Sequence, residues 1–471
     1  TDLDLGNYER FIDKTLTKKN SFTTGQVYQS VIKREREGGY LGKTIQVIPH
    51  VVDEIKERIY AATEDNDFLI IELGGTVGDI EGLPFMEAIR SIRHELPKTN
   101  TMNIHLSLVP YIKAAGELKT KPTQHSVQEL RRIGITPHML VCRTERELPK
   151  ALKDKLALAC DIDRNAVIEA GDAQSIYQVP LQFIKEGILT PLSEHFNIKI
   201  KPNMEKWDTL VKNILLPQGE VTIAFVGKYL DLKESYKSLI EALIHAGAHL
   251  STKVNIHWCD SERIEDVGAY DIIGNSDAIL VAGGFGQRGV NGKLAAIKYA
   301  RENKIPYLGI CLGMQLAIIE FAKNVLGLED ANSIEFDPNT KNPLIYLIDE
   351  FIDQSGNKQI RTHESPMGGT MRLGEYPFEP LKGTHLQKAY GNNEIYYERH
   401  RHRYEANPKY KQVLEDAGMI ISGQSDGLIE AIELKDHPWF VGVQFHPEFT
   451  SHLETPNPII LEFVRQATKN K

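Results

Sequence analysis

The residue types most able to do covalent chemistry surround Cys311. An apolar run at 305–310 leads into Cys311, and a helical period begins directly after it, with Gly309 and Gly313 on either side. Flanking glycines permit the tight, strained strand-to-helix turn that exposes a nucleophile. A thiol at a helix N-terminus has a lowered pKa, because the helix dipole stabilises the thiolate. The pattern predicts a cysteine nucleophile, with a buried structural cysteine as the alternative.

Two further segments supply what such a thiol needs. The segment 281–289, VAGGFGQRG, ends an apolar run with glycines, whose backbone N–H groups can bind an oxyanion. His446 follows another apolar run, and Glu448 comes two residues later. A thiol nucleophile requires a base of this kind and a carboxylate that orients the base. The joint pattern predicts a catalytic set of Cys311, His446 and Glu448.

Three segments of the N-terminal half combine charged side chains with glycines or with a helix start. In the segment 70–82, IIELGGTVGDIEG, a hydrophobic run ends at Glu72. This segment suits the binding of a hard cation beside a phosphate loop. The alternative is an ordinary acidic loop. The segment 116–126, GELKTKPTQHS, suits a triphosphate, or is a solvated basic turn. The segment 1–11 carries Asp4. This carboxylate is either part of a site or part of an exposed acidic end.

The elements that must position these residues alternate along the chain. Apolar runs at 44–49, 68–75, 102–110 and 221–229 alternate with segments of helical period, such as 50–65 and 83–96. This alternation predicts parallel strands joined by crossover helices, with helices over both faces of each sheet. The fold class is therefore α/β.

The same alternating pattern predicts two domains, 1–198 and 220–471. Between them, the segment 199–219 has weak periodicity and proline, and it is the predicted linker. A length of 471 residues with 41% hydrophobic and 25% charged residues fits two or three globular domains.

Charge and cysteine usage narrow the partners and the compartment. The net charge of −9 argues against duplex nucleic acid as a partner. Four scattered cysteines without a CxxC pair argue against a disulfide framework or structural zinc and fit a reducing compartment. No run of about 18 apolar residues and no signal-peptide core occur in the sequence. We expect a cytoplasmic protein with no membrane partner.

The motifs of the C-terminal half resemble the class I glutamine amidotransferase domain. GGFGQRG, GICLGMQ and QFHPEF occur in the family's order. The resemblance implies that Cys311 attacks the carboxamide of glutamine, that His446 acts as base and then as acid, and that Glu448 orients His446. The implied glutamine-binding residues are Gly284 and Leu312, as oxyanion donors, with Gly313, Met314, Gln315, Glu335 and Arg403.

Arg403 is chosen over Arg401 within RHRHRYE (399–405). A solvated basic strand or a nucleic-acid patch is the alternative for this segment.

The whole chain resembles the CTP synthase family. The segments that carry this resemblance are TDLDLGNYERF, TIQVIPH, ELGGTVGDIEGLPF, KTKPTQHSVQEL, RHRHRYE and QFHPEFTS. The family uses ATP to phosphorylate the 4-oxygen of UTP, and ammonia from glutamine then displaces the phosphate to give CTP. Phosphoryl transfer makes a poor leaving group into a good one, with stabilisation by Mg²⁺. The implied fold is a P-loop-NTPase-like (dethiobiotin-synthetase-like) amidoligase sheet followed by the amidotransferase domain.

This second resemblance also implies nucleotide and metal residues. Asp4 and Glu72 match the family's Mg²⁺ carboxylates. The positions that match UTP and inhibitory CTP contacts are Asp79, Ile80, Glu81, Lys119, Thr120, Lys121, Pro122, Thr123, Gln124 and Lys155. The positions that match ATP contacts are Asp4, Asp172 and Ala173. GTP as allosteric activator, an internal ammonia passage and a homotetramer are implied in the same way.

One family feature is missing from these 471 residues. The family opens with a strand and a glycine-rich P-loop ending in GlyLys, whereas this sequence begins at Thr1 without a methionine. A P-loop binds the phosphates of ATP. We expect an N-terminally incomplete sequence that lacks the first strand of its sheet.

Two other readings stay open at this point. The first is another triad amidotransferase such as GMP synthase, against which KTKPTQHS and GGTVGDIE argue. The second is a P-loop-less glutaminase, or a regulatory, filament-forming homologue without synthetase activity.

Overall fold

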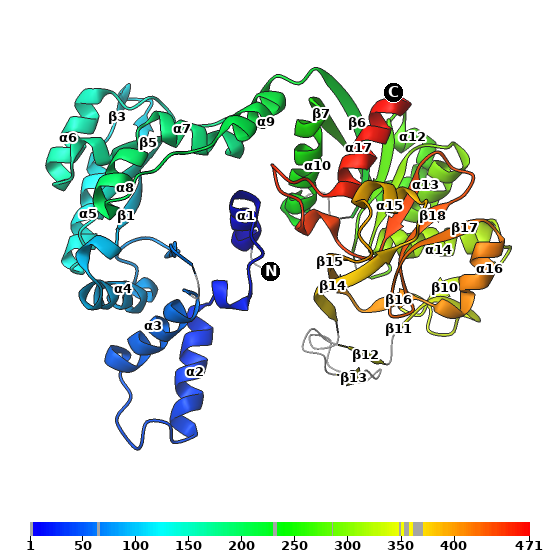
Figure 1. Cartoon of the computed structure of the whole chain (residues 1–471), viewed down its shortest axis with the longest axis horizontal. Helices are drawn as coiled ribbons and strands as arrows, with labels where there is room; N and C mark the ends of the chain where they lie inside the picture. The colour runs from blue at the N-terminus through cyan, green and yellow to red at the C-terminus, as the bar shows by residue number, and fades with distance from the viewer. Residues whose placement is uncertain are drawn as a thin grey trace. The chain divides into compact units, whose positions relative to one another are not determined.

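The computed structural model describes residues 3–63, 66–228, 233–284, 286–347, 350–352, 358–360 and 371–471. These residues form two compact units, shown in Figure 1. Unit 1 contains Lys14–Val211 and the start of the chain up to Leu5; unit 2 contains Lys212–Lys471 and also Gly6–Asp13. Helix α1 (Leu3–Ile12) therefore belongs mainly to unit 2. Across the described parts of the chain, no helix is both long and apolar enough to cross a membrane.

Unit 1 is built on a parallel three-stranded sheet with the order β1-β4-β5. Its strands are β1 (Ile104–Leu108), β4 (Met139–Thr144) and β5 (Val167–Gly171), and a hairpin of β2 (Tyr111–Ile112) and β3 (Glu117–Leu118) follows β1. Its helices are α2 (Thr24–Arg36), α3 (Val52–Ala61), α4 (Leu83–Glu95), α5 (Lys121–Arg132), α6 (Lys150–Cys160), α7 (Val179–Lys185) and α8 (Leu189–Phe196). Helix α9 (Glu205–Leu215) lies within the predicted linker.

Two of the strands predicted for this unit are wrong. Residues 47–51 form a short helical turn, and 68–75 run as irregular chain in which Ile70 is 91% exposed. A strand needs a neighbour for its backbone N–H and C=O groups, and neither segment pairs with any strand among the described residues. The apolar runs contain β-forming residues, but they do not show whether a neighbouring strand is present to pair with them.

The expectation that helices bury both faces of the sheet is also wrong at its β1 edge. Burial alternates along β1, and Leu106 on the open face is 66% exposed. The predicted strand at 102–110 is confirmed as β1 itself, which pairs with β4 in parallel register from Ile104 opposite Met139.

Unit 2 is built on a nine-stranded mixed sheet. Its strands in sheet order are β15 (Tyr396–His402), β14 (Arg372–Pro380), β17 (Met419–Ser425), β18 (Leu428–Leu434), β19 (Phe440–Val443), β9 (Tyr307–Ile310), β8 (Ala278–Val281), β6 (Gly219–Gly227) and β7 (Thr252–Asp260). The five strands from β19 to β7 are parallel, as the alternating pattern predicted, and the first four pair antiparallel.

Helices cover both faces of this sheet (Figure 1). They are α10 (Lys237–His249) and α17 (Pro458–Asn470) with one core, and α13 (Val290–Glu302) and α14 (Leu312–Asn324) with the other. Side chains alternate between the faces of a strand, so Phe225 of β6 joins the α10 core and Val226 joins the α14 core. Both side chains are fully buried.

Smaller elements complete unit 2. They are α11 (Ser261–Val267), α12 (Ala269–Ile273), α15 (His385–Tyr390), α16 (Lys411–Asp416), β10 (Ala331–Ser333), β11 (Asn342–Leu347), β12 (Glu350–Ile352), β13 (Lys358–Ile360) and β16 (Tyr404–Ala406).

Candidate active site

Cys311 occupies the sharp turn where β9 ends and α14 begins. Its backbone has a φ of 53° and a ψ of −104°, a conformation that is strained for a residue with a side chain. Its N–H donates to the carbonyl oxygen of Val443 on β19 at 2.7 Å, and its side chain is nearly buried. An added Cβ at Gly313 would overlap the carbonyl oxygen of Val281, so glycine is what lets α14 approach β8. The turn places the thiol at the positive end of α14.

His446 and Glu448 follow β19, the neighbour of β9. The Nδ1–H of His446 donates to Oε1 of Glu448 at 2.8 Å, which leaves Nε2 available to a reacting group. An added Cβ at Gly283 would lie 3.2 Å from Cε1 of His446 and 3.5 Å from Cβ of Cys311, so imidazole and thiol border the same glycine. The structure brings the three predicted catalytic residues together.

The charges of this group favour a protonated imidazole. Burial alone would lower the pKa of His446. The carboxylate of Glu448 and the hydrogen bond and charge of Cys311 oppose burial and together raise this pKa to about 10. An imidazolium beside the thiol stabilises the thiolate, which is the nucleophilic form.

A buried glutamine, Gln444 of the motif QFHPEF, also contacts the thiol, although it was not among the predicted site residues. The Nε2 of Gln444 donates to Sγ of Cys311 at 3.6 Å, and its Oε1 accepts a 3.0 Å bond from Nε2 of Gln315. Gln315 also donates to the carbonyl oxygen of Tyr404 at 2.8 Å. The Gln315 side chain thus bonds within the protein, and that of Met314 is fully buried in the core.

The glycine-rich segment after β8 lies beside Cys311. An added Cβ at Gly284 would lie 3.8 Å from Cδ2 of Leu312, so the two predicted oxyanion donors are neighbours. The N–H of Gly286 donates to Oε1 of Glu335 at 2.9 Å. Burial raises the pKa of Glu335, against that hydrogen bond and the charges of Lys228 and Arg403.

Arg403 is therefore within electrostatic reach of Glu335, whereas Arg401 is exposed and Arg399 binds Glu9. The structure separates the three arginines of RHRHRYE into three different surroundings.

A buried lysine behind this glycine-rich segment is a second residue that was not among the predicted site residues. Lys293 is 1% exposed, and its Nζ donates to the carbonyl oxygen of Ala282 at 3.0 Å. An added Cβ at Gly284 would lie 3.6 Å from this Nζ. Burial, together with the nearby charge of Lys228, lowers the pKa of Lys293 to about 7, against the influence of Cys311. A lysine side chain whose burial disfavours its charged form thus lies behind the predicted oxyanion donors.

In unit 1 the predicted phosphate segment meets the start of α5. Thr123 is fully buried and donates to the carbonyl oxygen of Leu108 at 3.1 Å. Buried Gln124 donates to Oγ1 of Thr120 at 3.1 Å. These side chains hold the segment to the sheet, while Lys121 and Pro122 form the first turn of α5.

Two predicted lysines meet around one carboxylate near the same place. Lys119 bonds to Glu117. The pKa of Glu117 is lowered by that bond first and also by the charge of Lys155 on α6. Both lysines thus act electrostatically on the carboxylate of Glu117.

Asp172 and Ala173 follow β5, and Asp172 lines a cavity. The cavity has a volume of about 400 Å³ and is lined by Asp172 together with Arg146, Lys153 and Glu169. Asp172 also accepts a 2.5 Å bond from Arg143. Asp172, one of the predicted ATP contacts, thus borders a cavity of this volume.

The remaining predicted residues are exposed. Asp79 precedes the short helix Ile80–Gly82, which contains Glu81, and Asp4 and Glu72 are also exposed. Among the described residues, no group of three or more His, Cys, Asp and Glu side chains could hold a metal ion. Asp4 and Glu72 each offer exposed carboxylate oxygens, the ligand type that Mg²⁺ takes from proteins while it keeps waters and substrate phosphates as its other ligands.

Comparison with known proteins decides the family. Residues 1–198 match the family profile described as CTP synthase N-terminus, and residues 231–466 match the profile described as glutamine amidotransferase class-I. The CTP synthase of Sulfurimonas denitrificans is 66% identical over 98% of this chain and 86% of its own length. The chain belongs to the CTP synthase family.

A second curated relative agrees with this assignment. The CTP synthase of Wolinella succinogenes is 66% identical over 100% of this chain and 85% of its own length. A solved structure, the glutaminase domain of the Trypanosoma brucei CTPS with bound acivicin, is 39% identical over 53% of this chain and 95% of its own chain, with a TM-score of 0.49.

The family assignment confirms the resemblance predicted from the motifs. The protein is a glutamine-dependent ligase that makes CTP from UTP with ATP as co-substrate, in pyrimidine nucleotide biosynthesis. GMP synthase, the other triad amidotransferase considered, is the wrong family for this chain.

Proposed function

We propose that Cys311, His446 and Glu448 hydrolyse glutamine and that the ammonia aminates UTP. One observation carries this proposal most directly. A cysteine in a strained turn at a helix N-terminus borders the same glycine as an imidazole whose Nδ1 binds a carboxylate at 2.8 Å. This is the arrangement of an activated thiol, its base and the group that orients the base.

The reaction follows from these groups. The Cys311 thiolate attacks the carboxamide carbon of glutamine, and the N–H groups of Gly284 and Leu312 bind the oxyanion. The His446 imidazolium gives its proton to the leaving nitrogen, which departs as ammonia. Neutral His446 then takes a proton from water, which attacks the thioester and releases glutamate and the thiol.

The charges near Glu335 suit the two ends of a free amino acid. Glu335 presents a carboxylate for the α-ammonium group, and Arg403 presents a guanidinium for the α-carboxylate. The first turn of α14, from Gly313 to Gln315, supplies backbone groups, because the side chains of Met314 and Gln315 are buried within the protein. The Nζ of Lys293 lies behind the oxyanion donors and adds positive charge there when it is protonated.

Unit 1 is the proposed site of nucleotide chemistry. The segments Asp79–Glu81 and Lys119–Gln124, with Lys155, bind UTP, or CTP as feedback inhibitor. Asp172, which lines the cavity after β5, and the adjacent Ala173 bind the adenine of ATP. Asp4 and Glu72 hold Mg²⁺, which when bound neutralises charge that develops on the transferred phosphoryl group.

The family also leads us to propose GTP as an allosteric activator, a homotetramer as the working assembly and the cytoplasm as its location. Neither nucleic acid nor a membrane is a partner in this proposal.

Glutamate release from glutamine tests the proposed triad. We expect Cys311→Ala to lower this activity by at least about a thousandfold, because removal of the nucleophile leaves only binding and oxyanion stabilisation. Cys259→Ala is the matched control, since Cys259 is also buried in unit 2 but packs in the core. Glutamate release by Cys311→Ala at the rate of the control would contradict the proposal.

A further inference from the structure

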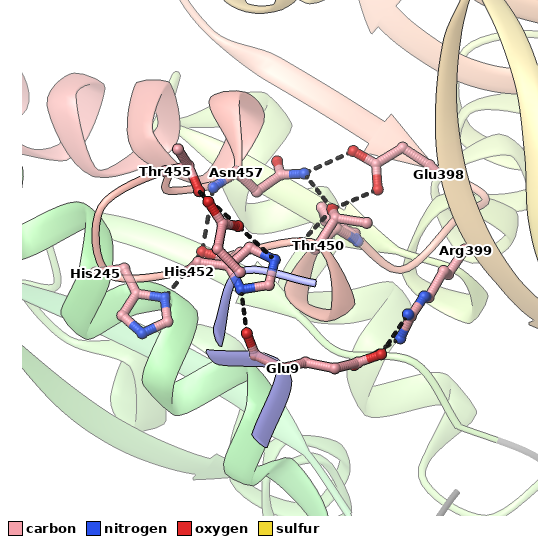
Figure 2. Close-up of polar contacts among 11 residues, drawn as sticks. Glu9, His245, Glu398, Arg399, Thr450, His452, Thr455 and Asn457 are labelled. Atoms are coloured by element: carbon pink, nitrogen blue, oxygen red, sulfur yellow. Dashed lines mark hydrogen bonds and ion pairs between the residues drawn. The ribbon is translucent and has the colours of Figure 1, made fainter. Parts of the chain in front are cut away.

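Residues Gly6–Asp13 come from the N-terminal half of the sequence, yet they pack within unit 2. Figure 2 shows Glu9 of this segment between Arg399 and His452. Glu9 is only 7% exposed. A buried carboxylate costs free energy unless it is paired. The groups that pair with Glu9 therefore offset the cost of its burial.

The first partner of Glu9 connects it to the proposed base. Both oxygens of Glu9 accept bonds from the guanidinium of Arg399, at 2.6 and 2.9 Å. Paired bonds of this type fix both distance and orientation. The carbonyl oxygen of Arg399 in turn accepts the backbone N–H of His446 at 2.8 Å. Two consecutive interactions therefore join Glu9 to the backbone of His446.

The second set of contacts holds the chain on the other side of Glu448. The Nδ1–H of His452 donates to the backbone carbonyl oxygen of Glu9 at 2.8 Å. Oγ1 of Thr455 donates to the carboxylate of Asp13 at 3.2 Å. The segment Gly6–Asp13 thus binds chain both before and after His446 and Glu448.

The space between this segment and Glu448 is closely filled. A cavity of about 10 Å³, about the size of one water molecule, is lined by Gly6, Glu9 and Arg10 on one side and by Glu448 and Phe449 on the other. The ring of Phe449 stacks on that of His446 with centroids 5.3 Å apart. A shift of Glu9 would therefore be transmitted to the groups that hold the imidazole.

We propose that Glu9 is a positioning residue for glutamine hydrolysis. It holds Arg399 and His452 so that His446 and Glu448 keep the geometry that maintains the Cys311 thiolate. This inference rests on the proposed triad. It adds to the glutaminase site a support from the segment of the chain matched by the CTP synthase N-terminus profile.

Glu9→Gln removes the charge that Arg399 requires and keeps the backbone carbonyl that His452 uses. We expect kcat for glutamine hydrolysis to fall by about tenfold or more, because small displacements of a catalytic group are costly. KM for glutamine should stay within about twofold, since Glu9 does not touch the substrate. Glu329→Gln, an exposed carboxylate in the same unit, is the matched control and should change neither constant.

A second readout separates positioning from a general loss of structure. The pH dependence of Cys311 alkylation by iodoacetamide, followed by peptide mass spectrometry, reports how well His446 stabilises the thiolate. We expect Glu9→Gln to move the midpoint to higher pH. Arg399→Gln should do the same, and the double variant should lose no more activity than the more impaired single variant.

An unchanged alkylation midpoint, or losses that multiply in the double variant, would overturn the inference. If Glu9→Gln does not fold, Glu9→Asp, which keeps the charge but shortens its reach, is measured in the same way. Failure of the triad itself would show differently, as full glutamate release by Cys311→Ala.

Discussion

At the scale of single residues, the site combines backbone strain with opposed charges. Cys311 keeps a φ of 53°, although it has a side chain, because its N–H binds Val443 and α14 begins immediately after it. Its imidazole partner remains protonated because Glu448 and Cys311 outweigh burial. Strain and charge that would be costly elsewhere are here concentrated at the atoms that react.

The raised pKa of His446 gives a pH-dependent contribution to stability. The folded value is about 10 and the ordinary value about 6.5. The proton on His446 therefore stabilises the folded state fully below about pH 6.5, and this contribution is lost as pH rises toward 10. Glu448→Gln removes a main cause of the raised pKa, so the stability difference from the unchanged protein should shrink across that interval.

Urea unfolding followed by tryptophan fluorescence at several pH values measures this difference. Exposed Glu329→Gln serves as the control. A difference between Glu448→Gln and the unchanged protein that stays constant from about pH 6.5 to 10 would show that His446 does not carry the proposed charge.

Sequence spacing predicted some site residues and could not predict others. Cys311, His446 and Glu448 were found because their neighbours, glycines and apolar runs, are local signals of a turn after a strand. Lys293 left a weaker signal, since it shares the apolar helix face of Ala296, Ile297 and Ala300. No local pattern predicts that Glu9 is buried against the glutaminase site, because its partner Arg399 is 390 residues away along the chain.

At the scale of elements, an apolar run predicts a strand only where a neighbour exists. The runs that became β6, β8 and β9 pair on both sides in the nine-stranded sheet. The equally apolar run at 68–75 has no strand beside it among the described residues, and Ile70 stays exposed. Composition indicates β-forming residues, but long-range pairing decides whether a strand forms.

The close approach of α14 to β8 beside Cys311 depends on Gly313. A Cβ at Gly313 would overlap the carbonyl oxygen of Val281, so Gly313→Ala must push α14 away from β8. We expect a loss of about 1–3 kcal/mol in the free energy of unfolding, the usual cost of overpacking, and a fall in glutamate release as Cys311 moves with the helix.

Gly219→Ala is the matched control, since an added Cβ there meets no atom within 4 Å. Thermal unfolding and glutaminase rates measured on both variants check the expectation. Equal stability for the two would mean that α14 does not need this close approach.

At the scale of the whole molecule, the two units are not divided at a single point of the sequence. Each unit has its own sheet, but the segment Gly6–Asp13 is contributed to unit 2 from the N-terminal end. The α/β class and the family followed from motifs and alternation. The placement of this segment did not, because it depends on contacts between residues at opposite ends of the chain.

The central claim is that this member of the CTP synthase family obtains ammonia from glutamine at Cys311 and uses it elsewhere to make CTP. The most direct test measures CTP formation from UTP, ATP and Mg²⁺ by the Cys311→Ala variant, with glutamine or with ammonium as nitrogen source, beside the unchanged chain. We predict that the variant forms CTP with ammonium at the rate of the unchanged chain and forms none with glutamine. Equal loss with both nitrogen sources, or CTP formation from glutamine, would contradict this account.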